Sequence, residues 1–234
     1  MFRTFVVCFA DSALPDRVEK LPAFPPFIFP ERPTMRDILK LSTGLLLFLL
    51  PAAVSAGEPA ATFESEPVGW ASVEGATTGG KGGPVFRVSD EATLAAKLKG
   101  NEPATIVITG PIALESKVRV GSNKTLLGEG AQGRLTGAGL TLAKVNNVIL
   151  RNLTIHDSDD DAINIEGESH HVWVDHCDLA RSHDGLLDIK HGSDLITVSW
   201  CHFHDHHKTC LLGHSDKPSA LAEDRGPRIK ESSG

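Results

Sequence analysis

Three stretches of this chain repeat one another at a fixed interval: VILRNLTI (148–155), VWVDHCDL (172–179) and ITVSWCHF (196–203). Each begins 24 residues after the one before it, and the apolar positions coincide, as at Val148, Val172 and Ile196. Within each stretch apolar and polar residues alternate, which is typical of a β-strand. A second set of short apolar runs follows the same interval: AINI from Ala162, LLDI from Leu186 and CLLG from Cys210.

Two short strands in every 24 residues leave no room for a crossover helix, so consecutive repeats must stack directly. The pattern predicts an all-β chain folded as a right-handed parallel β-helix, a solenoid of about 24 residues per coil. A β-propeller would need roughly 40 residues per blade, and the Leu/Asn pattern of leucine-rich repeats is missing. One helix is expected at 92–100, where it would cover the N-terminal end of the solenoid.

The interval also aligns two cysteines. Cys177 and Cys201 occupy equivalent positions on adjacent coils, so their Cα atoms are expected about 5 Å apart. That separation permits either a disulfide or a stacked pair of free thiols.

The start of the sequence carries a pattern typical of export. Residues 35–56 combine a basic segment, an apolar run and a small-residue cleavage site, which predicts a signal peptide rather than a membrane anchor. We therefore expect residues 1–34 to be an upstream extension outside the fold, and residues 57–234 to form a partial β-helix domain. The expected product is a secreted monomer, free of the membrane after cleavage. The net charge of −7 argues against a nucleic-acid partner.

An acidic cluster lies on the same 24-residue grid. The segment SDDDA (158–162), then Asp184, then Lys208 fall into one column of three coils, with Asp188 one short strand further along. Such a group of carboxylates, without a neighbouring arginine, would repel itself unless some held protons or a cation joined them. Calcium suits carboxylates from neighbouring coils because it accepts six to eight oxygens in flexible geometry. The alternative is that these aspartates only stabilise solvated turns.

These segments resemble the pectate lyase family of parallel β-helix polysaccharide lyases. The resemblance covers roughly 68–224 and is most specific from NNVILRNLTI (146–155) through DGLLDIKHGSD and TVSWCHFHDHHKTCLLGHSD. It implies calcium-dependent β-elimination of polygalacturonate, the main chain of pectin. By position it implies that Asp161, Asp184 and Asp188, and less directly Asp159, are calcium ligands. Lys208 corresponds to the contact with the substrate carboxylate.

The family's catalytic base is an arginine on a strand that the 24-residue interval predicts near position 220. The sequence there, ALAEDRGPRIKESSG (220–234), contains a proline and clustered charges, which do not fit a central strand. Arg225 belongs to the DRG element, and Arg228 is a distant candidate. We therefore assign no catalytic base, and expect a C-terminally incomplete solenoid that is inactive as written.

Three other functions compete with this interpretation. A non-catalytic calcium-dependent pectin binder needs the acidic column and Lys208 but no base. A β-helix galacturonan hydrolase is suggested by the fragments at Gly213–Ser215 and Arg228–Lys230, although less than one coil separates them. A zinc site is conceivable at His202, His204 and His206, which alternate onto one face of a predicted strand.

Overall fold

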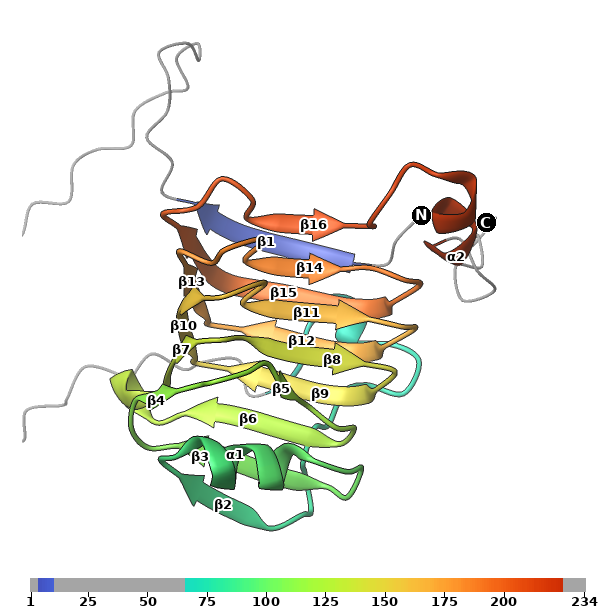
Figure 1. Cartoon of the computed structure of the whole chain (residues 1–234). Coiled ribbons are helices and arrows are strands. Elements are labelled where there is room, and N and C mark those ends of the chain that lie inside the picture. Colours follow the sequence, from blue (N-terminus) through green and yellow to red (C-terminus); the bar gives the residue numbers. More distant parts are fainter. Residues whose placement is uncertain (1–3, 11–65, 225–234) are drawn as a thin grey trace, which may run out of the picture. The chain divides into compact units, whose positions relative to one another are not determined.

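The computed structural model of the chain describes residues 4–10 and 66–224. The predicted signal peptide at 35–56 lies outside the described residues, as do Arg225 and Arg228. Figure 1 shows a stack of parallel coils, in which the strands of successive coils lie side by side. The described residues contain no helix that is both long and apolar enough to cross a membrane.

The strands form two parallel sheets that face each other across the interior. The 11-stranded sheet contains, in spatial order, β2 (Val85–Val88), β3 (Ala104–Ile108), β6 (Lys124–Gly128), β9 (Asn146–Arg151), β12 (His170–Asp175), β15 (Asp194–His204), β13 (Asp178–Ala180), β10 (Thr154–Ser158), β7 (Arg134–Gly137) and β4 (Ile112–Ala113), with β1 (Thr4–Ala10) also paired to β15. The five-stranded sheet contains β16 (Cys210–Leu212), β14 (Leu187–Ile189), β11 (Ile163–Glu166), β8 (Leu140–Ala143) and β5 (Val118–Arg119). The predicted parallel β-helix is confirmed.

In the larger sheet the predicted 24-residue register is confirmed from β6 through β9 and β12 to β15, and from β10 through β13 to β15. Val172 pairs with Val148 on one side and with Ile196 on the other. In the five-stranded sheet the last step is one residue shorter, because Cys210 pairs with Leu187 instead of Leu186. The predicted alignment of the CLLG run was therefore wrong by one position. Six residues lie between Ala180 and Leu187, whereas five lie between His204 and Cys210.

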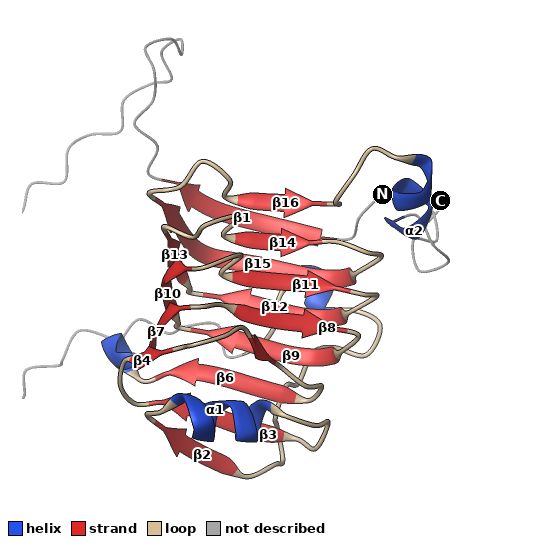
Figure 2. Ribbon diagram, viewed as in Figure 1, coloured by secondary structure: helices blue, strands red, loops and turns tan. Residues whose placement is uncertain are grey.

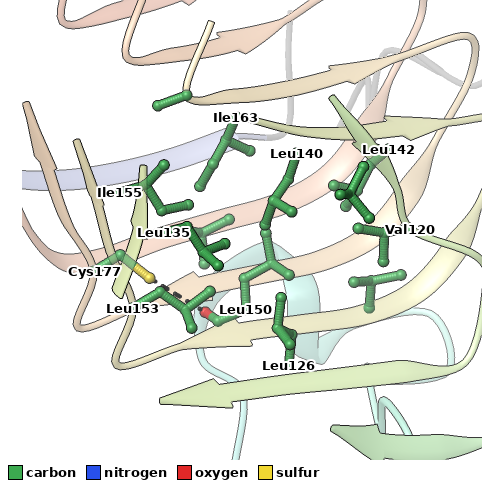
Figure 3. Close-up of a cluster of buried hydrophobic side chains, with 14 of the residues drawn as sticks. Val120, Leu126, Leu135, Leu140, Leu142, Leu150, Leu153, Ile155, Ile163 and Cys177 are labelled. Atoms are coloured by element: carbon green, nitrogen blue, oxygen red, sulfur yellow. Dashed lines mark hydrogen bonds between the residues drawn. The ribbon is translucent and has the colours of Figure 1, made fainter. Parts of the chain in front are cut away.

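Apolar side chains from both sheets fill the interior of the solenoid. Figure 3 shows Leu135, Leu140, Leu150 and Ile155 pointing toward one another, and all four are fully buried. This arrangement follows from the strand alternation, which sends every second side chain inward.

Cys177 and Cys201 are both buried and both free thiols, which decides between the two alternatives left open by the sequence. Cys177 Sγ lies 3.7 Å from the Leu150 carbonyl oxygen, drawn as a dashed line in Figure 3. The hydrogen bond with Cys177, together with burial, raises the pKa of the Cys201 thiol well above its ordinary value.

The expected helix is present as α1 (Glu91–Leu98), and it lies at the N-terminal end of the stack beside β3 (Figure 2). The Asp90 side chain caps it by accepting a 2.9 Å hydrogen bond from the Thr93 N–H. Leu94 and Leu98 point into the core cluster, so α1 covers apolar surface at this end. Two short 3₁₀ turns, η1 (Gly69–Ser72) and η2 (Gly130–Gln132), and the helix α2 (Pro218–Asp224) complete the described elements.

Candidate active site

The candidate residues gather at one edge of the five-stranded sheet, where its parallel strands begin. Lys117 immediately precedes β5, Asp161 comes two residues before β11, Asp184 three before β14 and Lys208 two before β16. Because parallel strands start at the same edge, these side chains share one region although they come from four coils. The fold thus brings Asp161, Asp184 and Lys208, which share one column of the sequence repeat, together in space.

Three carboxylates meet in this cluster. One oxygen from each of Asp160, Asp161 and Asp184 lies within 4.8 Å of the other two. Asp161 is only 3% exposed and its Oδ1 accepts a 3.0 Å hydrogen bond from the Gly185 N–H. Asp159 is exposed and is not a member of this group. Among the consecutive aspartates, the turn therefore brings Asp160 and Asp161 to Asp184.

Asp188 adds a fourth carboxylate from within β14. A Cβ placed on Gly185 would lie 2.6 Å from Asp188 Oδ1 and 3.0 Å from Asp161 Oδ1, so both carboxylates converge on this glycine. Burial and the neighbouring Asp161 charge raise the pKa of Asp188. The cluster therefore has a negative potential that favours a cation.

Lys117 and Lys190 join Lys208 in bringing positive charge to the cluster. Lys117 Nζ lies 2.7 Å from Asp160 Oδ2, and Lys190 Nζ lies 3.4 Å from Asp188 and 3.6 Å from Asp161. Lys208 pairs with Asp184, and this hydrogen bond lowers the pKa of the Asp184 carboxyl. The cation was inferred from the repulsion between the carboxylates. The three ammonium groups reduce that repulsion.

Lys117 was missed because its coil departs from the repeat. Val118 pairs with Leu140, only 22 residues later, so the 24-residue interval does not carry Lys117 into the acidic column. The sequence feature that could have identified Lys117 is its position directly before a short apolar run.

An additional oxygen donor borders the cluster. Asn164 pairs in register with Asp188 on the neighbouring strand, and its Oδ1 is buried without a hydrogen-bond partner. A buried carbonyl oxygen left unpaired is costly, and a hard cation is one partner that would relieve the cost.

A cavity of about 1000 Å³ lies elsewhere on the same sheet. Ala143, Glu166 and His191 line it, and they lie at or just beyond the C-terminal ends of β8, β11 and β14. The acidic cluster lies at the opposite ends of these strands and is separate from this cavity.

Comparison with known proteins agrees with this architecture. The family model described as pectate lyase matches residues 39–229. The chain belongs to the pectate lyase family. It is 46% identical over 173 residues to a probable pectate lyase B of Aspergillus terreus, an alignment that covers 70% of this chain and 52% of the relative. It is 40% identical over 195 residues to a pectate trisaccharide-lyase of Bacillus licheniformis, covering 71% and 57%.

Solved structures of this family have the same fold. Pectate lyase Bsp165PelA from Bacillus sp. N165, in complex with trigalacturonate, matches with a TM-score of 0.60 and 32% identity over 66% of this chain and 57% of that one. The cedar pollen allergen jun a 1 matches with a TM-score of 0.59 and 32% identity, over 64% and 53% of the two chains. The chain spans about half the length of the curated relatives it matches.

Proposed function

We propose that this chain binds polygalacturonate at the acidic cluster, the edge of the five-stranded sheet where its strands begin. We propose that, as a pectate lyase, it cleaves this polymer by calcium-dependent β-elimination. Asp161, Asp184 and Asp188 are the proposed calcium ligands. The observation that carries the proposal is the convergence of Asp160, Asp161 and Asp184 within 4.8 Å. Asp160 joins the proposed ligand set on this geometry, and Asp159 stays a secondary candidate from the resemblance.

The donor set fits calcium rather than a softer metal. Its candidate ligands are carboxylate oxygens, with the unpaired Asn164 Oδ1 beside them. Calcium accepts six to eight such oxygens at variable angles, whereas magnesium requires near-octahedral geometry. Carboxylates from different coils satisfy the variable geometry of calcium more readily than the octahedral geometry of magnesium.

A cation held here would supply Lewis-acid polarisation of a uronate carboxylate, which weakens the neighbouring C5–H bond. The chain's own contribution is to hold the carboxylates and to present lysines. Lys208 is exposed at the cluster, so its ammonium can turn from Asp184 to a substrate carboxylate. Its hydrogen bond with Asp184 raises the pKa of Lys208, so the ammonium is charged while this pair is intact.

We assign no proton acceptor. The basic side chains that pair with the cluster in the described part of the chain are lysines, and Arg225 and Arg228 lie outside the described residues. Calcium-dependent pectin binding without cleavage is therefore the second candidate function. We further propose that residues 57–234 form the domain and that the protein is secreted after loss of residues 35–56. On this proposal the β-helix does not depend on β1 (Thr4–Ala10), although β1 pairs with β15 in the full chain.

The test uses the full chain with polygalacturonate in calcium and in EDTA. Ultraviolet absorbance detects the unsaturated product of elimination, reducing-sugar release detects any cleavage, and calorimetry measures binding. We expect calcium-dependent binding that is lost in an Asp161→Asn/Asp184→Asn variant. Unsaturated product supports the lyase, binding alone supports the second candidate, and saturated product would indicate hydrolysis. Binding unaffected by both EDTA and the double variant would overturn the proposed site.

A further inference from the structure

A second cluster of metal-ligating side chains lies on the outer face of the larger sheet, away from the acidic edge. It contains His156 on β10, Asp178 on β13 and His204 on β15, with ligand atoms within 4.8 Å of one another. His156 Nε2 hydrogen-bonds Asp178 Oδ1, and His204 Nε2 lies 3.2 Å from the same oxygen. His202 Nδ1 approaches the other oxygen, Oδ2, at 2.9 Å.

The strand register explains how a gap forms between the two histidines. His156, Ala180 and His204 are aligned across three coils, so the middle position carries only a methyl group. Two strand spacings separate the outer backbones by about 9.6 Å. The imidazoles lean over Ala180 until their centroids are 5.4 Å apart, nearly perpendicular at 88°. Asp178, two residues before Ala180 on the same face, projects beside this gap.

The Asp205 carboxylate contacts the other ring nitrogen of His204. Its Nδ1 lies 3.0 Å from Asp205 Oδ2, so both ring nitrogens face carboxylate oxygens. Metal-ligating histidines commonly donate their remote N–H to a carboxylate, which fixes the tautomer and directs the other lone pair at the metal. Asp205 would have this role, and the lone pair of Nε2 would then face Asp178.

We propose that His156, Asp178 and His204 bind a divalent transition-metal ion of the zinc class. Two imidazole nitrogens and one carboxylate oxygen are ligands that zinc accepts, and three protein ligands leave a tetrahedral position for water. The nitrogen donors make the cluster a poor site for calcium or magnesium, which prefer oxygen. His202 supports the ion indirectly, through the second oxygen of Asp178.

This ligand set differs from the one suggested by the sequence. The alternation of His202, His204 and His206 pointed to a site within a single strand. The structure instead brings His206 Nε2 within 2.7 Å of the Ser182 carbonyl oxygen, away from the cluster. Only His204 is shared between the two sets as an ion ligand.

Arg181 competes with the ion. Its guanidinium lies 3.2 Å from His156 Nδ1, and because arginine only donates, Nδ1 must accept and the proton must lie on Nε2. Binding of an ion at Nε2 requires that proton to move or leave, and the Arg181 contact is lost. Removal of Arg181 should therefore tighten ion binding several-fold.

The experiment titrates Zn²⁺ alone, by calorimetry, into the untagged full chain in EDTA-free buffer, in a Cys8→Ser/Cys210→Ser background that removes thiols outside the buried pair. Co²⁺ replaces Zn²⁺ in a parallel visible-absorption titration, which reports whether the bound ion has the tetrahedral geometry expected of this site. The variants are His156→Ala/His204→Ala, Asp178→Asn and Arg181→Gln. The control is His207→Ala, an exposed histidine outside the cluster, and circular dichroism checks that each variant folds.

We expect one Zn²⁺ per chain, an affinity at least about tenfold weaker in the double histidine variant and in Asp178→Asn, and no change in His207→Ala. Asp161→Asn/Asp184→Asn should leave zinc binding intact, which separates this site from the acidic edge. Absence of stoichiometric zinc binding, or equal affinity in the double histidine variant, would overturn the proposal. Unchanged or weaker binding in Arg181→Gln would overturn the assignment of His156.

Discussion

The backbone N–H of Gly185 donates a 3.0 Å hydrogen bond to Oδ1 of Asp161, a residue on the preceding coil. This contact links the two turns from which the acidic cluster is built. It also satisfies one lone pair of a carboxylate that is almost completely buried. Gly185 is therefore the residue on which the geometry of the cluster depends most directly.

Gly185→Ala should displace the carboxylates. The added Cβ would lie 2.6 Å from Asp188 Oδ1 and 3.0 Å from Asp161 Oδ1, closer than such atoms approach without rearrangement. We expect a loss of about 1–3 kcal/mol in the free energy of unfolding, and calcium affinity roughly tenfold lower, equivalent to about 1.4 kcal/mol. Urea denaturation and calorimetry measure the two effects.

The matched control is Gly110→Ala, whose new Cβ would meet only Ser89 Cβ, at 3.9 Å. It should change neither quantity by more than about 0.5 kcal/mol. A folded Gly185→Ala variant that binds calcium as tightly as the parent chain would show that the cluster does not hold the ion.

Lys124→Met should destabilise the N-terminal coils. The Lys124 side chain is buried, and its Nζ donates to the carbonyl oxygens of Gly100, Glu102 and Ser122 at 2.9, 2.6 and 3.0 Å. Methionine retains the apolar stem but leaves these carbonyls without their donor. We expect a loss of about 2 kcal/mol in the free energy of unfolding. Lys99→Met, at an exposed position, is the control and should be nearly neutral.

The same lysine has a characteristic pH dependence. Burial lowers the pKa of Lys124, so near the ordinary lysine pKa of about 10.4 the unfolded chain binds more protons than the folded chain. Stability linked to this group therefore rises as the pH increases toward that value. The stability difference between the parent chain and Lys124→Met should widen from neutral to alkaline pH. A difference that narrows would mean that the pKa is not lowered.

Thiol reactivity should divide the cysteines sharply. Cys177 and Cys201 are buried in the interior, and the pKa of Cys201 is raised by its hydrogen bond with Cys177 and by burial, which suppresses the reactive thiolate. Cys210 is exposed. In a Cys8→Ser background, Ellman's reagent should modify Cys210 rapidly and the buried pair only after unfolding. Rapid native modification of either thiol would contradict the burial of both in the structure.

The sequence predicted the fold because a parallel β-helix repeats its apolar positions wherever consecutive coils have equal length. Val148, Val172 and Ile196 show this directly, since their predicted alignment is also their pairing. The prediction failed where a turn changed length. Cys210 moved by one position because the turn after β15 is one residue shorter than its equivalent.

The site was harder to predict, because turn conformation decides it. A period places the whole DDD run of 159–161 opposite Asp184, but it does not say which side chains face inward. The structure selects Asp160 and Asp161. Lys190 illustrates the same limit, since a lysine at the end of a strand is usually solvated, whereas here it lies between two carboxylates.

Lys190→Met should make the stability of the chain depend more strongly on calcium. The Lys190 ammonium lies 3.6 Å from Asp161 and 3.4 Å from Asp188, both largely buried, and the attraction of these carboxylates outweighs burial and raises the pKa of Lys190. Without the Lys190 ammonium, the negative charges of Asp161 and Asp188 are neutralised less completely. In EDTA we expect a loss of about 2 kcal/mol in the free energy of unfolding. If calcium binds the folded cluster as proposed, saturating calcium should restore most of that loss.

Thermal denaturation with and without calcium measures this difference, and Lys81→Met, at an exposed position, is the control. The calcium-induced increase in Tm should be larger in Lys190→Met than in the parent chain or the control. An equal loss of stability in EDTA and in calcium would mean that the ion does not take over the charge that Lys190 neutralises. In that case the buried carboxylates would depend on their lysines alone, and the calcium site would have to involve other residues.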